Sequence, residues 1–146
     1  MASKSYCGPG YWNVQFNSLL NLNYGKRTKA IAFADDLIIA VREGNVQEAE
    51  NFANIEINKV TNWAEETKIN FNEQKSKIML ATRRRRREIT EVNVYLNTKP
   101  LQQFKSIQYL GITLDTKLNI REHIISTTNK CTQLIHTLAK SAKLNW

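Results

Sequence analysis

The stretch that decides the fold is Ala30-Ile31-Ala32-Phe33-Ala34-Asp35-Asp36-Leu37-Ile38-Ile39-Ala40-Val41. Two short apolar runs, Ala30–Ala34 and Leu37–Val41, are separated only by Asp35 and Asp36. Each run is too short for a helix, and a two-residue connection between such runs is typical of a tight β-hairpin. Because the apolar character is continuous, we expect both strands to be buried on both faces. The pattern predicts two carboxylates at the tip of an otherwise apolar hairpin.

Helices are predicted on both sides of this hairpin. Apolar residues recur at helical spacing over about residues 10–22, and a longer stripe predicts a helix from Val46 to about Thr67, with Glu56 among the acidic residues outside the stripe. The further predicted elements are strands at Ile69–Phe71, Ile78–Ala81, Val92–Asn97 and Tyr109–Ile112 and a helix around Ile124–Leu138. The glycine in Tyr109–Ile112 suggests a bulge or a close backbone approach. This order predicts an α+β fold, with helices against one face of a mainly antiparallel sheet.

Composition bounds the class of protein. The chain has 146 residues, 21 Lys+Arg and 13 Asp+Glu, and a net charge of +8, enough length for one hydrophobic core. It has no apolar run of about 20 residues, which a membrane span needs, and no signal-peptide pattern. Cys7 and Cys131 lie far apart without a CxxC, so neither a disulfide framework nor a zinc site is expected. We expect an intracellular protein of the nucleus or cytoplasm, without a membrane partner.

The charge is unevenly distributed. Residues 1–73 carry 7 basic and 9 acidic side chains, and residues 74–146 carry 14 and 4, including the run Arg83–Arg87. Such asymmetry favours a polyanion partner, most often nucleic acid. A solvated loop that keeps the protein soluble is the alternative. From charge alone, both interpretations stay open.

The paired aspartates also allow two interpretations. Aspartate favours turns for local reasons, so a solvated acidic turn is the simpler one. Neighbouring carboxylates between apolar strands, however, repel each other unless a cation neutralises them. Oxygen ligands suit Mg²⁺, and two such ions about 3.5–4 Å apart serve in-line phosphoryl transfer. The apolar flanking strands therefore favour the interpretation as a metal site.

Four motifs occur in order along the chain: Ser5–Leu20 with its Gly8-Pro9-Gly10, Phe33-Ala34-Asp35-Asp36, Ile69-Asn70-Phe71-Asn72-Glu73-Gln74-Lys75-Ser76-Lys77, and Tyr109-Leu110-Gly111. The second resembles the Phe/Tyr-Ala-Asp-Asp signature of reverse transcriptases, and most closely that of non-LTR (LINE-type, Jockey-like) retrotransposons. The others resemble, respectively, the helix before that hairpin, the segment after the long helix, and the strand that ends the palm. The resemblance covers roughly Ser5 to Trp146.

The resemblance implies the fold and the reaction. It implies a partial reverse-transcriptase palm over residues 1–115, an RNA-recognition-like antiparallel sheet with packed helices. Residues 116–146 would be a C-terminal helical segment, the start of the thumb. The implied activity is that of an RNA-directed DNA polymerase, which uses an RNA template, a DNA primer, deoxynucleotides and two Mg²⁺ ions.

The resemblance also implies roles for particular residues. Asp35 would be the main metal ligand, with Asp36 assisting. Lys75 would be a general acid for the pyrophosphate leaving group, and a surface lysine is the alternative. The residues expected to contact nucleic acid are Phe33 near the primer end, Asn13, Asn17, Tyr109 and Gly111, together with Arg83, Arg84, Arg85, Arg86 and Arg87 on phosphates.

The chain departs from the family pattern at its start. Intact relatives carry a further catalytic aspartate on a strand upstream of the first helix, and they have Gln-Gly where this sequence reads Ser3-Lys4. A site made of Asp35 and Asp36 alone lacks the ligand that bridges both ions. We therefore expect a fragment that is inactive as an isolated chain. The alternative is a non-catalytic basic nucleic-acid-binding module derived from a retrotransposon.

Overall fold

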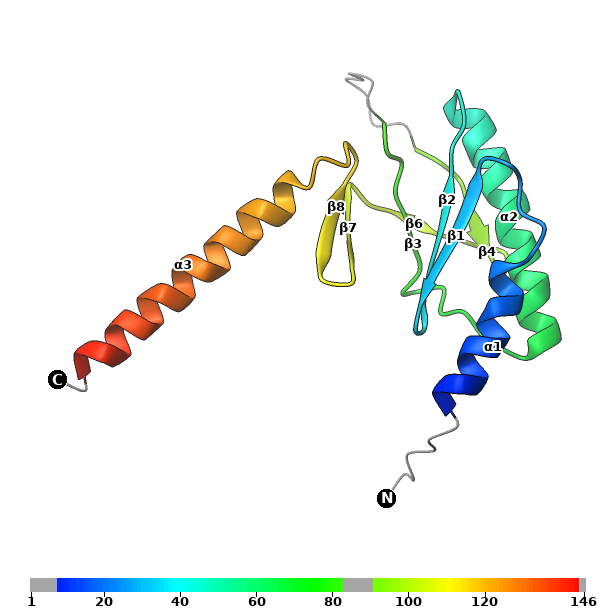
Figure 1. The fold of residues 1–146 in the computed structure, drawn as a ribbon. Coiled ribbons are helices and arrows are strands. Elements are labelled where there is room, and N and C mark those ends of the chain that lie inside the picture. Colours follow the sequence, from blue (N-terminus) through cyan, green and yellow to red (C-terminus); the bar gives the residue numbers. More distant parts are fainter. Residues whose placement is uncertain (1–7, 83–90, 145–146) are drawn as a thin grey trace. The chain divides into compact units, whose positions relative to one another are not determined.

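The computed structural model describes residues 8–82 and 91–144 (Figure 1). Its elements in chain order are α1 (Gly8–Leu20), β1 (Thr28–Phe33), β2 (Asp36–Val41), α2 (Val46–Thr67), β3 (Lys77–Ile78), β4 (Tyr95–Leu96), β5 (Lys99–Pro100), β6 (Gln102–Gln103), β7 (Ser106–Tyr109), β8 (Ile112–Asp115) and α3 (Arg121–Leu144). They form two compact units: Met1–Ser76 with Thr90–Leu101, and Lys77–Ile89 with Gln102–Trp146. The α+β class is confirmed, and the predicted domain boundary after residue 115 stays a prediction.

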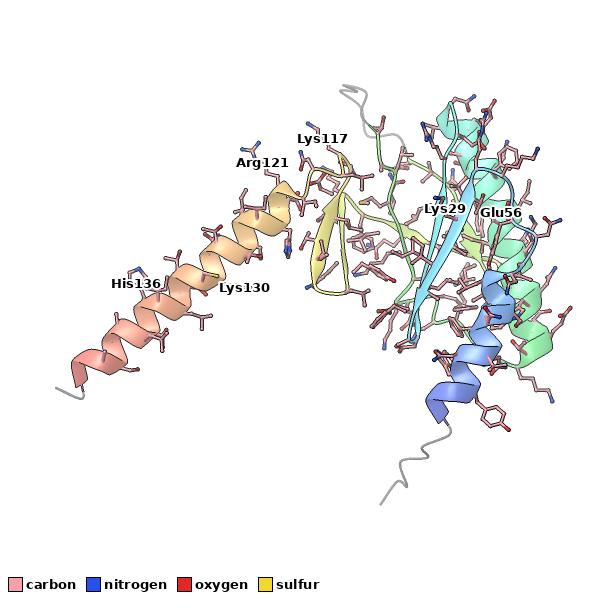
Figure 2. All side chains as sticks on the ribbon, in the orientation of Figure 1. Lys29, Glu56, Lys117, Arg121, Lys130 and His136 are labelled. Carbon is pink, nitrogen blue, oxygen red and sulfur yellow. The ribbon has the colours of Figure 1, made fainter. Side chains whose placement is uncertain are left out.

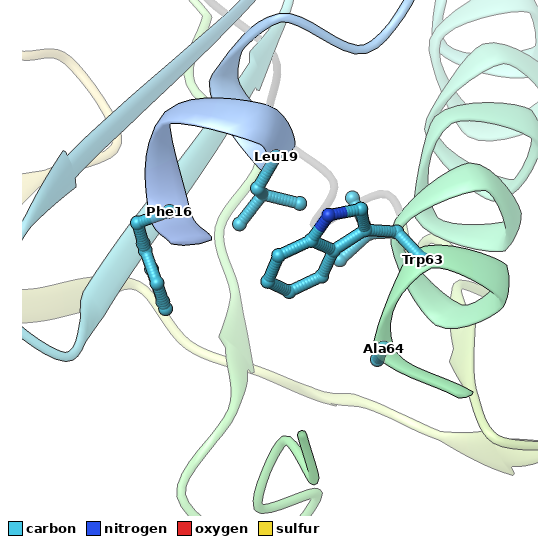
Figure 3. Close-up of a cluster of buried hydrophobic side chains, with 5 residues drawn as sticks. Phe16, Leu19, Trp63 and Ala64 are labelled. Atoms are coloured by element: carbon cyan, nitrogen blue, oxygen red, sulfur yellow. The ribbon is translucent and has the colours of Figure 1, made fainter. Parts of the chain in front are cut away.

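In the first unit, α1 and α2 pack against one face of the β1–β2 hairpin (Figure 1). The buried side chains of this core are Phe16 and Leu19 from α1 and Val60, Trp63 and Ala64 from α2 (Figure 3). The hairpin contributes Ala32, Leu37 and Ile39, which are partly buried against this core. Full burial of a side chain such as leucine or phenylalanine contributes about 1.5–3 kcal/mol. This small core therefore fixes the hairpin to both helices.

The other face of the hairpin is open. Burial alternates along β1, where Ile31 is 51% exposed and Phe33 is 62% exposed. Within the described residues β1 and β2 pair only with each other. The prediction that both strands are buried on both faces is therefore wrong, because the helices cover one face only. The alternation is the pattern of a half-buried antiparallel pair.

The long helix α2 has the bounds that the apolar stripe predicts. It begins after Asn45, whose side-chain oxygen accepts a hydrogen bond from the backbone N–H of Glu48 at 2.7 Å. It ends at Thr67, and the next residue, Lys68, has a φ of 57° and an N–H that bonds back to the carbonyls of Ala64 and Glu65. Both ends thus satisfy backbone groups that a helix leaves without partners.

The segment 92–97 docks onto α2 with less strand structure than predicted. Val92, Val94 and Leu96 are buried as the alternation predicts, but only Tyr95 and Leu96 belong to a strand, β4. The side chain of Asn54 on α2 replaces a neighbouring strand: it accepts from the N–H of Tyr95 at 3.0 Å and donates to the Asn93 carbonyl at 2.9 Å. One side-chain amide of a helix therefore satisfies backbone groups that a sheet would otherwise pair.

The described residues of the second unit form two strand pairs and a long helix. Strands β7 and β8 are antiparallel, β3 and β6 are parallel, and α3 follows β8. The predicted strand Ile78–Ala81 is reduced to Lys77–Ile78. Near the start of α3, the N–H of Thr113 on β8 donates to Nδ1 of His123 at 3.4 Å. No helix in the described ranges is long and apolar enough to cross a membrane.

Candidate active site

The β1–β2 turn gives Asp35 and Asp36 different positions. Phe33 pairs with Asp36 across the ladder, so the two-residue loop is Ala34-Asp35 and Asp36 opens β2. The predicted loop Asp35-Asp36 is wrong by one position. Ala34 has a φ of 52°, and a positive φ at the first central residue belongs to the tight turns whose twist matches that of paired strands. The ladder therefore includes one of the two carboxylates.

Both carboxylates are open to solvent. Asp35 and Asp36 are exposed, and among the described residues neither side chain has an ion-pair or hydrogen-bond partner. Directly paired residues of two strands share a face, so Asp36 lies on the exposed face with Phe33. No group of three or more His, Cys, Asp and Glu side chains in the described ranges could hold a metal. This turn therefore offers two oxygen-bearing side chains without a third.

Trp12 on α1 contacts the turn directly. Its indole Nε1 donates to the carbonyl oxygen of Ala34 at 2.7 Å. The ring lies 4.5 Å from that of Phe16, between centroids, and Phe16 belongs to the core. Helical spacing assigns Trp12 to the apolar stripe. It gives no signal for a contact 22 positions away, so the sequence does not predict that Trp12 bonds to the turn.

Asn13 and Asn17 lie on α1, four positions apart. Both are exposed, and residues at this spacing share a helix face. They therefore present two side-chain amides from one side of the helix that carries Trp12. Their contacts with template or nucleotide stay a prediction.

Lys75 lies in a turn that Asn72 organises. The side-chain oxygen of Asn72 accepts from the N–H of Gln74 at 3.0 Å and from that of Lys75 at 3.1 Å. Lys75 itself is exposed. The strand predicted before this turn, at Ile69–Phe71, is wrong, because these residues are irregular. Their apolar side chains pack on the core instead. The role of Lys75 as an acid stays a prediction.

Tyr109 and Gly111 belong to a hairpin in the second unit. Tyr109 pairs with Ile112, so the predicted single strand is in fact two strands joined by Leu110-Gly111. Both turn residues have positive φ, 48° and 81°, as a type I′ turn requires. A Cβ on Gly111 would meet nothing within 4 Å. The glycine therefore serves the backbone angle rather than the bulge or close approach that we expected.

The arginine run Arg83–Arg87 lies outside the described residues. Other cations of the second unit are exposed, among them Lys117, Arg121 and Lys130 (Figure 2). Contact of any of these cations with phosphates stays a prediction.

A buried carboxylate supports the loop that leads into β1. Glu56 on α2, labelled in Figure 2, is 1% exposed. It accepts from the Gly25 N–H at 2.7 Å and from Lys59 Nζ at 2.9 Å. The prediction that Glu56 lies outside the buried stripe is wrong. Its side chain is buried, because these two donors compensate the negative charge of the carboxylate. Burial, together with the negative charge of Glu56, raises the pKa of Tyr24 to about 12.

Sequence comparisons identify the family. Residues 5–114 match the family described as reverse transcriptase (RNA-dependent DNA polymerase). The chain belongs to the reverse transcriptase family. This match contains Trp12, the Ala34-Asp35 turn and Lys75, and it confirms the resemblance drawn from the motifs.

Three curated relatives come from R1 elements. Two are described as retrovirus-related Pol polyproteins from type-1 retrotransposable elements R1 2 and R1 of Nasonia vitripennis, 26% and 25% identical over 95% and 97% of this chain. The third, 29% identical over 97% of the chain, is a putative 115 kDa protein in element R1DM of Drosophila melanogaster. The chain spans 35%, 43% and 14% of their lengths. These relatives confirm the non-LTR type, and no solved structure gives a significant match.

Proposed function

We propose that this chain forms part of the palm of an RNA-directed DNA polymerase, in which Asp35 and Asp36 bind Mg²⁺. Family membership supports the reaction class. The observation that carries the site is the turn itself, which leaves two adjacent carboxylates exposed and without partners among the described residues. Carboxylate oxygens are ligands that Mg²⁺ prefers, so the residues present fit the ion in type.

The two aspartates do not complete a two-metal site by themselves. A third acidic ligand is expected from the upstream aspartate that intact relatives carry. When bound, the metal would neutralise charge on the transferring phosphate. Asp35 and Asp36 would hold it beside the exposed ring of Phe33, against which the primer end would lie. Lys75 would deliver a proton to the leaving pyrophosphate.

A direct test measures the metal without the reaction. We expect Mn²⁺, used as a paramagnetic probe in place of Mg²⁺, to broaden the backbone NMR signals of Asp35 and Asp36 at millimolar concentrations. Asp35→Asn should remove the broadening. The matched control is Glu65→Gln, because Glu65 and Glu66 form another exposed pair of neighbouring acids, on α2. Equal broadening at both pairs, or broadening that survives in Asp35→Asn, would contradict the site.

A polymerase assay tests the second part of the proposal. The isolated chain should give no primer extension on a primed RNA template with Mg²⁺. Robust incorporation that Asp35→Ala abolishes would show that the described carboxylates suffice, contrary to our expectation.

The basic half of the chain supports a second candidate, a non-catalytic nucleic-acid-binding module. Residues 74–146 carry 14 basic and 4 acidic side chains. Both candidates predict salt-dependent binding of nucleic acid, so affinity alone does not separate them. The binding module predicts indifference to divalent ions at Asp35, whereas the palm predicts the Mn²⁺ effect described above.

A further inference from the structure

The turn that carries Asp35 holds Ala34 in a backbone conformation that alanine does not favour. Ala34 lies in the left-handed region with a φ of 52°, where the Cβ of an L-residue crowds the following carbonyl. Glycine or asparagine normally occupies such a position. A two-residue loop of Ala34-Asp35 therefore needs support from outside the hairpin to stay in one geometry.

Trp12 supplies that support at a particular atom. Its indole N–H, which has no other role than donation, donates to the Ala34 carbonyl at 2.7 Å. This carbonyl belongs to the planar peptide group whose nitrogen is that of Asp35. Holding the oxygen therefore fixes the plane from which the Asp35 backbone continues.

The indole is itself fixed by the core. Its ring lies 4.5 Å from the ring of Phe16 at an interplanar angle of 31°. Phe16 is 4% exposed and meets Trp63 edge-on at 6.0 Å. A chain of aromatic contacts thus runs from α2 through α1 to the tip of the hairpin.

We infer that Trp12 is a positioning residue for the metal-binding turn: its indole hydrogen bond to Ala34 holds the backbone that carries Asp35. The effect of Trp12 on the backbone does not depend on the proposed function. Its consequence, the geometry of the Asp35 carboxylate toward a divalent ion, rests on that function. The alternative is that Trp12 only packs against Phe16, which would give the same core but would not fix the turn. The two roles separate when the N–H is removed and the aromatic ring is kept.

Trp12→Phe makes that separation. We expect the NMR order parameter of the Asp35 amide to fall from the range of rigid backbone, about 0.85, toward that of flexible backbone, below about 0.6. The apparent Kd for Mn²⁺ at the turn should rise about three- to tenfold, the size of effect expected from one hydrogen bond. In the unaltered chain, the Trp12 indole proton should exchange with solvent more slowly than in the urea-unfolded chain.

Trp63→Phe is the matched control. It also removes one indole hydrogen bond, from Trp63 Nε1 to the hydroxyl of Ser18 at 2.9 Å, but it does not touch the turn. Ser18→Ala removes the acceptor of the same bond and serves if the core substitution does not fold. Phenylalanine at position 63 keeps an aromatic ring against Phe16, and Ser18→Ala keeps every ring of the cluster. Both controls should therefore leave the Asp35 order parameter and the Mn²⁺ affinity unchanged.

The outcomes distinguish this inference from the proposed function. An Asp35 order parameter that is the same in Trp12→Phe and in the unaltered chain would overturn the positioning role. Absence of Mn²⁺ binding in the unaltered chain would overturn the proposed metal site, while the order parameter would still decide the role of Trp12. An equal loss of order in Trp12→Phe and Ser18→Ala would indicate general loosening of α1 and would also overturn it.

Discussion

The backbone N–H of Gly25 donates to Oε1 of Glu56 at 2.7 Å, which joins the loop before β1 to the middle of α2 across 31 positions. The same oxygen lies 3.5 Å from the hydroxyl of Thr28, the first residue of β1. A Cβ added to Gly25 would lie 2.9 Å from this oxygen. Glu56 therefore ties the loop before β1 to α2, and a side chain at position 25 would force its carboxylate to shift.

Gly25→Ala should destabilise the protein. The methyl group would displace the buried carboxylate from its donor, and we expect the free energy of unfolding to fall by about 1–3 kcal/mol, the penalty for a buried polar group without its partner. Urea denaturation measures this change. Gly44→Ala is the control, because a Cβ there meets nothing within 4 Å, and it should change stability by less than about 0.5 kcal/mol. Similar losses in both variants would contradict the role of Glu56.

Tyr24 gives the same network a pH dependence. Burial and the charge of Glu56 raise the pKa of Tyr24 to about 12 from its ordinary value of 10. The unfolded chain thus releases this proton near pH 10 and the folded chain near pH 12. The contribution of neutral Tyr24 to the free energy of unfolding is therefore fully present below pH 10, and it is lost as the pH rises to 12.

Absorbance titration of phenolate, taken as the difference between the unaltered chain and Tyr24→Phe, measures this pKa. Glu56→Gln should lower the pKa only in part, because burial is the larger cause. A difference titration centred near 10 would contradict the burial of this hydroxyl.

Much of this fold follows from local patterns, and its departures have physical causes. The α2 stripe predicts Val46–Thr67 because one helix face meets one core. The Asp35-Asp36 loop was misplaced because strand twist, which a composition pattern does not contain, selects Ala34-Asp35 as the central pair. Glu56 was misplaced because its partner Gly25 is remote in sequence.

The candidate site was predictable to the same extent. The aspartates follow from a contiguous motif, and their exposure is seen in the structure. The Trp12 contact with Ala34 joins two segments 22 positions apart, so periodicity within either segment does not reveal it. A contiguous motif is enough to nominate the aspartates for the proposed site, whereas a contact such as that of Trp12 with Ala34 depends on tertiary packing.

The N-cap of α2 gives a further prediction. Asn45→Ala removes the acceptor for the Glu48 N–H, and we expect a loss of about 1 kcal/mol in the free energy of unfolding. Gln47→Ala is the control at an exposed neighbouring position. Urea denaturation followed by helical circular dichroism compares them. An equal effect of both substitutions would show that the cap contributes nothing.

The β7–β8 turn should be improvable by a single substitution. Leu110 has a φ of 48° before Gly111, and asparagine tolerates this angle better than leucine. Leu110→Asn should slow hydrogen exchange of the β7–β8 ladder amides, and Gly111→Ala should speed it, because alanine is strained at a φ of 81°. Changes in the same direction in both variants would contradict a type I′ turn.

The register of the β1–β2 ladder has a consequence for how copies of this sequence can decay. Ala32, Leu37 and Ile39 face the core because each sits at an alternate position of its strand. Missense changes on the open face, at Ile31 for example, leave that alternation intact. Insertion or deletion of one codon within a strand reverses the faces of all residues beyond it. In a lineage that accumulates mutations, the hairpin should therefore outlast many substitutions but not the insertion or deletion of one codon within a strand.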